Sequence, residues 1–285
     1  MIYGLETTTQ IDPWLNRGYH DLPFETYCEI PAANSHGLMD IRNKSPKYYQ
    51  WKKSKPRTTD SMAFGTLVHW IILEPKVLEE RMCLKKTVDG RTKEGKAYNA
   101  DFQASLLPHQ VAVDEETYDK VRFVRDQLAA HPYTSKLIGK GLSEQVGCWV
   151  HNETQVFCKT RLDKLFPKEG WIIDVKTTYD ASPRAFQKQM VNLDYDLQAA
   201  FYMKGFEYIY KRRPEGYIYL CVENTEPHDI AIYTPEQTVI DHGNYKFQQG
   251  LMTYAECVKS GQWPGYEPRA VPMELPGWAV YMEQE

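Results

Sequence analysis

Two aspartates and a lysine lie on consecutive runs of the sequence that have the composition of β-strands. Asp163 ends the first run, and Asp174 and Lys176 lie in the second, eleven and thirteen residues later. Side chains alternate between the faces of a strand, so Asp174 and Lys176 share one face while Ile173 and Val175 can be buried on the other. Two carboxylates can hold a hard divalent cation, and a neighbouring lysine can position or help to deprotonate a water. This set could therefore carry out metal-assisted cleavage of a phosphodiester.

The same residue types also have simpler interpretations. An Asp-x-Lys pair on a strand is commonly an exposed ion pair that contributes about 0–1 kcal/mol. His69 lies on an apolar helical segment, where a lone histidine is more often a packed core residue, although neutral imidazole can also bind a metal. Gln198 and Tyr202 are four residues apart, so they share a helix face and can simply pack together. Only the ordered set of these residues favours a functional site.

The composition excludes several classes of protein. The chain has 285 residues, of which 42% are hydrophobic and 25% charged, as in ordinary soluble globular proteins. It contains no apolar run of about 18 residues and no signal-peptide pattern, so we expect a cytoplasmic protein without a membrane segment. Its six dispersed cysteines form no C-x-x-C pair. This argues against a zinc ribbon or an iron–sulfur cluster, and we expect reduced thiols.

A basic segment stands out against the net charge of −4. Between residues 41 and 59 there are seven basic residues and no acidic one, and Lys52, Lys53 and Lys55 are three of the seven. Tyrosines and Trp51 are interleaved with them. Basic groups beside stackable rings suit a phosphate backbone and its bases. A solvated helix face with buried aromatic residues explains the same segment equally well.

Apolar spacing, capping residues and prolines predict the helices. We expect helices at residues 34–51 with an interruption at Pro46, at 64–72 with Asp60 or Ser61 as N-cap, at 115–138 with a break at Pro132, at 182–210 and at 235–259. Three other segments are expected to lack regular structure, namely an N-terminal arm (1–30), a loop (85–110) and a proline-rich tail (261–285).

Alternating or continuous apolar runs predict the strands. We expect them at residues 144–150, 155–165, 171–176, 216–223 and 229–233. The resulting αβββαβ order indicates an α/β fold, in which a mixed central sheet is flanked by helices and preceded by further N-terminal helices. We expect residues 31–260 to form a single domain.

Taken together, these motifs resemble the PD-(D/E)XK nuclease superfamily, whose core is restriction-endonuclease-like. In particular they resemble the RecE-type exonucleases (exodeoxyribonuclease VIII) and, more distantly, the RecB nuclease domain and lambda exonuclease. The matching motifs, in family order, are Gly65-x-x-x-His69, Arg161-Leu162-Asp163, Asp174-Val175-Lys176-Thr177 and Gln198-x-x-x-Tyr202, with weaker matches at residues 35–40, 44–46 and 73–75. One departure is that Ile173, not proline, precedes Asp174.

The resemblance implies a role for each motif residue near the metal. Asp163 and Asp174 would be the metal carboxylates, with the carbonyl of Val175 and the imidazole of His69 as further ligands. Lys176 would orient the attacking water and stabilise the negative charge that develops at phosphorus.

Other residues would support the site or touch DNA. By the resemblance, Gln198 and Tyr202 would brace the site or contact the DNA backbone, and Ser35, in the matching segment 35–40, is a candidate DNA-binding residue. Lys52, Lys53 and Lys55 are DNA-binding candidates because of the basic segment described above. Arg161 shares a strand face with Asp163, so its guanidinium could hold a phosphate. Glu144 is a candidate additional acid, although a glutamate at a strand end is more often solvated.

The resemblance also implies an activity. RecE-type enzymes use Mg²⁺, with Mn²⁺ as an alternative, to degrade one strand of linear double-stranded DNA from its 5′ end. They leave a 3′ single-stranded overhang for a single-strand annealing protein and form ring-shaped homo-oligomers (trimers or tetramers) in a bacterial or phage-infected cell. Two alternatives stay open at this point. One is an endonuclease of the same superfamily, and the other is a catalytically inactive DNA-binding module.

Overall fold

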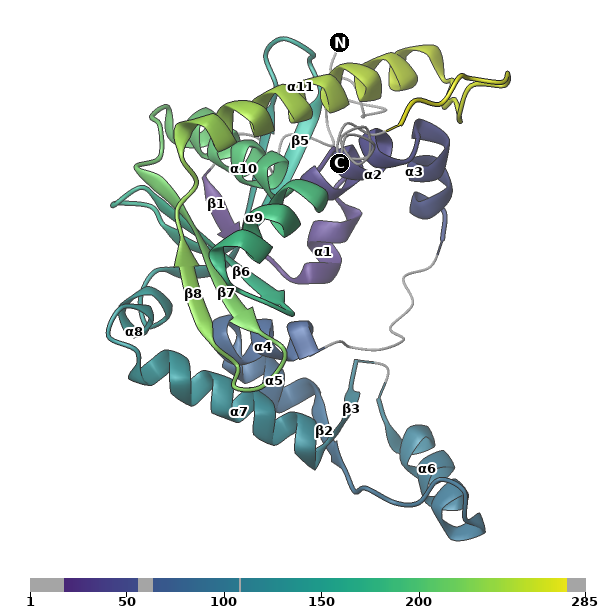
Figure 1. The fold of residues 1–285 in the computed structure, drawn as a ribbon, viewed down its shortest axis with the longest axis vertical. Helices are drawn as coiled ribbons and strands as arrows, with labels where there is room; N and C mark the ends of the chain where they lie inside the picture. Colours follow the sequence, from purple (N-terminus) through teal and green to yellow (C-terminus); the bar gives the residue numbers. More distant parts are fainter. Residues whose placement is uncertain (1–17, 56–63, 108, 276–285) are drawn as a thin grey trace, which may run out of the picture.

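The computed structural model describes residues 18–55, 64–107 and 109–275, and a six-stranded mixed sheet forms its centre (Figure 1). The strand order is β1-β4-β5-β6-β7-β8, and of these neighbours only β6 and β7 are parallel. The bounds are β1 Tyr19–Asp21, β4 Leu142–Val150, β5 Phe157–Phe166, β6 Trp171–Thr178, β7 Gly216–Glu223 and β8 Ile230–Tyr233. All five expected strands are therefore present, and β1 extends the sheet beyond them.

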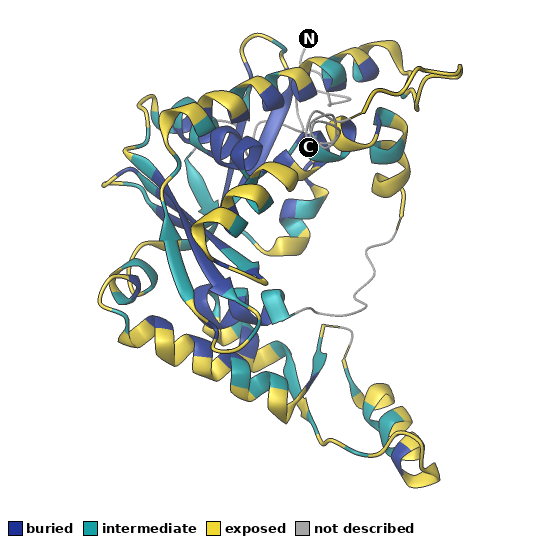
Figure 2. Ribbon diagram, viewed as in Figure 1, coloured by how far each residue is buried: buried dark blue, intermediate teal, exposed yellow. Residues whose placement is uncertain are grey.

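Helices cover both faces of this sheet, and the central strands are buried between them (Figure 2). The first face carries α2 Ser35–Asn43, α9 Pro183–Asn192, α10 Tyr195–Tyr210 and α11 Gln237–Ser260. The second carries α4 Phe64–Leu73, α5 Pro75–Arg81, α7 Glu115–Ala130 and α8 Thr134–Ile138. Along β6, Ile172 packs in the first layer while Ile173 and Val175 pack in the second, as the alternation predicted. No described helix is long and apolar enough to cross a membrane.

The segment 19–29 is ordered, so the expectation of an irregular arm is wrong for these residues. β1 pairs with β4 at the sheet edge, and α1 Phe24–Glu29 follows it. The buried Lys159 of β5 donates from Nζ to the carbonyls of Tyr27 (2.6 Å) and Ile30 (2.7 Å) at the end of this helix. Cationic donors stabilise the carbonyls at a helix C-terminus. The helix thus depends on a partner more than a hundred residues away, which local sequence does not reveal.

The expected loop at 85–110 is also wrong, because it contains a helix between two short strands. β2 Met82–Lys85 and β3 Val111–Asp114 pair in parallel with each other, and α6 Lys93–Ser105 lies between them. Thr92 caps α6 by accepting from the Gly95 amide at 2.9 Å. The helix stands away from the main sheet (Figure 1), and only Gly95 in it is buried. With no apolar stripe, α6 has no helical periodicity to detect.

The long helix expected at 182–210 is interrupted, and the other helices largely follow the prediction. Leu193 and Asp194 separate α9 from α10, and Asp194 has a left-handed backbone (φ 53°). Residues 34–51 form α2 and then α3 Pro46–Lys53, so Pro46 begins the second helix as expected for a proline in a first turn. The expected N-cap at Asp60 or Ser61 lies outside the described residues, as does the end of the tail from Pro276. Residues 261–275 form neither helix nor strand.

α10 and α11 pack closely where Gly243 faces the start of α10. A Cβ on Gly243 would lie 2.0 Å from the Asp196 carbonyl oxygen and 2.9 Å from the Ala200 Cβ. Real Cβ atoms do not approach a backbone oxygen so closely, so only glycine permits this contact between the two helices.

We predict that Gly243→Ala destabilises the protein by about 1–3 kcal/mol, as overpacking of a rigid contact does. In an unconstrained helix the same change would stabilise by about 1 kcal/mol. Chemical denaturation of both proteins measures the difference. Gly250→Ala on the same helix is the matched control, because its nearest neighbour would be the Leu38 Cβ at 3.2 Å, and it should cost less. Equal effects of the two changes would contradict the prediction.

Candidate active site

The centre of the site is a point where two neighbouring strands part. The backbone pairing of β5 and β6 runs from Phe166–Trp171 to Lys164–Ile173 and then stops. Beyond it, the Val175 amide donates to Asp163 Oδ2 at 2.7 Å, and the Val175 carbonyl lies 3.0 Å from His69 Nε2. The side chains of Asp163 and His69 therefore satisfy the amide and carbonyl of Val175, which a paired strand would otherwise satisfy.

His69 reaches this gap from α4. Because a carbonyl can only accept, Nε2 carries the proton in this contact, and in the neutral tautomer of that kind Nδ1 has the free lone pair. Nδ1 faces Asp163 Oδ2 at 3.8 Å. The close approach of α4 to β6 depends on Gly65, where a Cβ would lie 2.8 Å from Thr177 Oγ1. The first match of the sequence motif thus serves to seat the histidine.

Glu144 on β4 completes a group with His69 and Asp163, whose ligand atoms all lie within 4.8 Å of one another. Glu144 occupies the register position opposite Asp163 between the pairs Ser143–Lys164 and Gln145–Leu162, and its φ of 53° is unusual for a non-glycine residue. Two carboxylates and an imidazole with a free lone pair fit a hard divalent cation such as Mg²⁺ or Mn²⁺. Glu144, predicted only as an additional acid, is therefore one of the three.

The acids of this group hold protons unusually well. Burial, reinforced by the charge of Asp163, raises the pKa of Glu144 to about 8. Burial also raises the pKa of Asp163 to about 6, with a further increase from Asp174 that the His69 side chain opposes. Buried carboxyls that lie close together favour their protonated forms, and a bound divalent cation would favour their ionised forms instead.

Asp174 and Lys176 form a buried ion pair beside this group. Asp174 Oδ2 lies 2.5 Å from Lys176 Nζ, and the Asp174 side chain is only 2% exposed. Asp174 is not part of the three-residue group, although the sequence placed it there with Asp163. Burial alone would lower the pKa of Lys176, but Asp174 and Asp163 outweigh it and raise that pKa. Lys176 is therefore a cation at neutral pH.

α10 holds the ammonium of Lys176. Lys176 Nζ donates to Gln198 Oε1 at 2.7 Å, and Gln198 Nε2 donates to Tyr202 Oη at 3.0 Å. The ring of Tyr195 lies 4.4 Å from the same ammonium, a cation–π distance. The structure thus joins Gln198 and Tyr202 to the lysine. It adds Tyr195, which sequence reasoning missed although it lies three residues before Gln198.

The guanidinium of Arg161 lies against two carboxylates. Its Nε lies 2.6 Å from Glu144 Oε2, and one Nη lies 3.6 Å from Glu74 Oε2. Glu74, which follows α4, was not selected from the sequence, although it lies in one of the weaker motif matches. Phosphate binding by Arg161 remains a prediction, and it would require the guanidinium to leave these partners.

Of the other predicted DNA-binding residues, Ser35 lies on α2, Lys52 and Lys53 lie on α3, and Lys55 follows α3. Ser35 begins α2 and is 1% exposed, so its side chain faces the protein interior. Lys52 pairs with Asp40 at 2.8 Å, Lys55 lies 5.5 Å from the ring of Trp51, and Lys53 is exposed. DNA contact by these residues remains a prediction.

His36, the second residue of α2, is a neighbour of the site that sequence reasoning did not select. Burial and then the Lys176 ammonium lower the pKa of its imidazole. α2 therefore lies close enough to Lys176 for the charges of His36 and Lys176 to interact. The motif match at residues 35–40 was the available signal.

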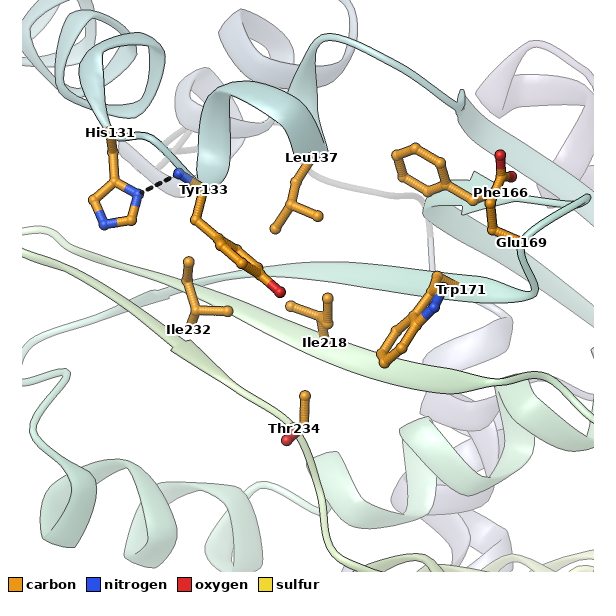
Figure 3. A pocket seen from close by; sticks show the side chains of 9 residues that line it. All are labelled: His131, Tyr133, Leu137, Phe166, Glu169, Trp171, Ile218, Ile232 and Thr234. Atoms are coloured by element: carbon orange, nitrogen blue, oxygen red, sulfur yellow. Dashed lines mark hydrogen bonds between the residues drawn. The ribbon is translucent and has the colours of Figure 1, made fainter.

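A separate cavity of about 650 Å³ lies between α8 and the strands β6, β7 and β8 (Figure 3). Tyr133 points into it, and Trp171, Leu137 and Ile218 form apolar walls. Its described lining residues include none of the candidate site residues. It opens on the second face near the start of β6, whereas Asp174 and Lys176 belong to the first face. This cavity is therefore separate from the strand gap that collects the candidate site residues.

Comparison with known proteins gives a family and a fold. Residues 43–270 match the PDDEXK-like domain of unknown function (DUF3799). A candidate exonuclease from Eubacterium rectale has a similar structure, with a TM-score of 0.57 and 12% identity over 92% of this chain and 99% of its own. A phage-related exonuclease from Haemophilus somnus 129PT aligns with a TM-score of 0.32 and 14% identity over 69% of this chain and 95% of its own, which is too low to indicate a shared fold. A comparison with curated protein sequences found no match.

The raised pKa of Glu144 predicts a pH dependence of stability. The folded pKa of about 8 exceeds the usual 4.5, so between these values the folded protein binds more protons than the unfolded chain. The stabilising contribution of Glu144 to the free energy of unfolding is therefore fully present below about pH 4.5 and is lost as the pH rises to about 8. Glu144→Gln removes this titration. In a chelating buffer, the melting temperature of the variant minus that of the wild type should therefore increase between pH 5 and pH 8. A difference that is constant with pH would contradict the prediction.

Proposed function

The chain belongs to the PDDEXK-like family (DUF3799), and from that premise we propose that it is a metal-dependent DNA exonuclease. The family and the shared fold support a nuclease, and they confirm the restriction-endonuclease-like α/β fold expected from the sequence. We propose further that it degrades linear double-stranded DNA from the 5′ end and leaves 3′ overhangs for recombination by strand annealing. The RecE-type resemblance supports this finer assignment.

One observation carries the proposal. The gap between β5 and β6 collects His69, Asp163 and Glu144 within 4.8 Å and places the Asp174–Lys176 pair beside them. A bound Mg²⁺ or Mn²⁺ would polarise the phosphate and lower the pKa of a water. The three-residue group would hold that ion, with Asp174 and the Val175 carbonyl nearby as additional donors.

The side chains around Lys176 then perform two tasks, which are to fix its positive charge in place and to keep water away from it. The Lys176 ammonium, held by Gln198 and the Tyr195 ring, offers a fixed positive charge for the phosphate oxygen that becomes more negative. The buried surroundings exclude water from this charge and so strengthen its effect. Tyr202 keeps the Gln198 amide oriented so that its oxygen faces the lysine.

The proposed partners follow from the same resemblance. We propose that the substrate is a double-stranded DNA end, that an annealing protein takes the 3′ strand, and that the chain assembles as a ring-shaped homo-oligomer of three or four copies. A ring suits a net charge of −4, because only its channel needs basic residues such as those of α3. The Eubacterium rectale protein, named as a candidate exonuclease, supports an end-dependent activity.

The test is a time course with Mg²⁺ on linear, 5′-phosphorylated duplex DNA labelled at either end, beside a covalently closed circle. We expect early release of 5′-terminal mononucleotides and an intact circle. Lys176→Met is the matched control, because it removes the ammonium and keeps the length of the side chain. It should bind DNA and metal but cleave at least about 100-fold more slowly, the loss typical for one stabilising group.

Each other outcome changes the assignment. Cleavage of the circle would place the protein among the endonucleases of the superfamily. Binding without cleavage of either substrate would indicate an inactive DNA-binding module. Full activity of Lys176→Met would refute the assignment of the site.

The basic residues at the end of α3 and just after it yield a prediction for binding. Replacing Lys52, Lys53 and Lys55 with glutamine should weaken DNA binding and reduce the slope of log K against log salt by about 0.9 for each lysine that binds a phosphate. Fluorescence anisotropy between low and moderate salt measures this slope. A control variant with glutamine at Lys136, Lys140 and Lys168 neutralises three exposed lysines near α8 and should keep the wild-type slope. An unchanged slope in the α3 variant would place the DNA elsewhere.

A further inference from the structure

A buried network of charges lies where α10 begins, one turn before Gln198. Lys246 Nζ of α11 lies 2.6 Å from Asp194 Oδ1 and 2.9 Å from Asp196 Oδ2. The side chains of all three residues are at most 3% exposed. Arg42 at 3.4 Å from Asp194, and His242 at 2.6 Å from Asp196, add further donors at the rim.

Such a network is a costly way to pack two helices. Removing charges from water is expensive, and well-packed apolar residues in the same place are often as stable or more stable. What the charges add is geometric specificity, since each donor has a fixed partner. Asn43 Nδ2 also donates to Asp194 Oδ2 at 2.7 Å, so the network joins the end of α2 and the middle of α11 to the first residues of α10.

The network connects directly to the groups that hold the catalytic lysine. The backbone carbonyl of Asp194 accepts a hydrogen bond from the backbone N–H of Gln198 at 3.1 Å, which is the first hydrogen bond of the helix. Tyr195, whose ring contacts Lys176, is the next residue along the chain, and its carbonyl accepts from Tyr219 Oη of β7 at 2.9 Å. A rotation of the first turn of α10 would therefore move both partners of the ammonium together.

We infer that the Asp194–Lys246–Asp196 network positions Lys176 for cleavage by fixing the register of the first turn of α10 against the sheet. The inference rests on the nuclease function proposed above. Asp194 and Lys246 are positioning residues, because they act through Gln198 and Tyr195 and touch neither metal nor DNA. Asp194 has a left-handed backbone (φ 53°) and makes no side-chain cap to the helix amides, so its carboxylate accepts instead from Lys246 and Asn43.

The backbone conformation allows a clean variant. Asp194→Gly removes the carboxylate and keeps the left-handed residue, since glycine adopts that conformation freely. Lys211→Gly is the matched control at the other end of the same helix, where Lys211 is also left-handed (φ 57°) and lies far from the site in the chain. Asp194→Asn is the conservative variant, because its amide oxygen can still accept from Lys246 and asparagine tolerates the left-handed region.

We expect Asp194→Gly to lower kcat by on the order of 10- to 100-fold, as a displacement of about 1 Å in an active site does. KM for DNA should stay within about twofold, because the contacts of Lys52 and Lys55 are with Asp40 and Trp51 and do not involve Asp194. Asp194→Asn should recover much of the loss, and Lys211→Gly should cleave like the wild type. Circular dichroism and thermal melting confirm that each variant is folded before its rate is compared.

A double-mutant cycle separates positioning from mere stability. If Asp194 acts through Gln198 and Tyr195, then Asp194→Gly should cost distinctly less kcat in a Gln198→Ala background, where only the Tyr195 ring still holds Lys176. Equal losses in both backgrounds, or a wild-type kcat in folded Asp194→Gly, would overturn the inference. Should Asp194→Gly fail to fold, Asp194→Asn enters the same cycle with the same criteria. A wild type that cleaves no DNA would instead overturn the proposed function, and the inference with it.

Discussion

The whole site depends on the early end of the β5–β6 ladder. After the Lys164–Ile173 pair the two strands no longer exchange hydrogen bonds, so the amide and carbonyl of Val175 need other partners. Asp163 accepts from the amide, and His69 donates to the carbonyl. A buried backbone group without a partner is costly, so the fold and the site stabilise each other at this residue. The gap also admits the carboxylates from two directions, Asp163 and Glu144 from one side and Asp174 from the other face.

Around that gap, charge is kept in balance by contacts from both helical layers. α4 supplies His69, and α10 supplies Gln198 and the Tyr195 ring to the ammonium of Lys176. The carboxyls of Glu144 and Asp163 have raised pKa values because burial outweighs the opposing effects of Arg161 and His69. A divalent cation would neutralise these carboxyls, which is the physical reason for regarding this part of the molecule as a metal site.

The sequence predicted which residues share a strand face better than it predicted how separate strands and helices meet. Strand periodicity correctly placed Asp174 and Lys176 on one face and Ile173 and Val175 on the other, because alternation is a property of the strand itself. The participation of Glu144 depends on cross-strand register and an unusual backbone angle, neither of which is encoded in a local pattern. Tyr195 was missed because the break between α9 and α10 was not foreseen. That break is stabilised by Lys246, some fifty residues later. α1 and α6 were missed for related reasons, one relying on Lys159 and the other lacking an apolar stripe.

The arm formed by β2, α6 and β3 has an evolutionary consequence. Its two strands pair with each other and not with the six-stranded sheet, but Val113 of β3 is buried in the second helical layer, whereas most residues of α6 are exposed. The length and sequence of α6 can therefore vary, or the helix can be lost, without altering the register of β4, β5 and β6. Selection can act on α6 independently while the strands that carry the acids stay fixed. Related chains are accordingly free to diverge most in the segment between Lys85 and Val111.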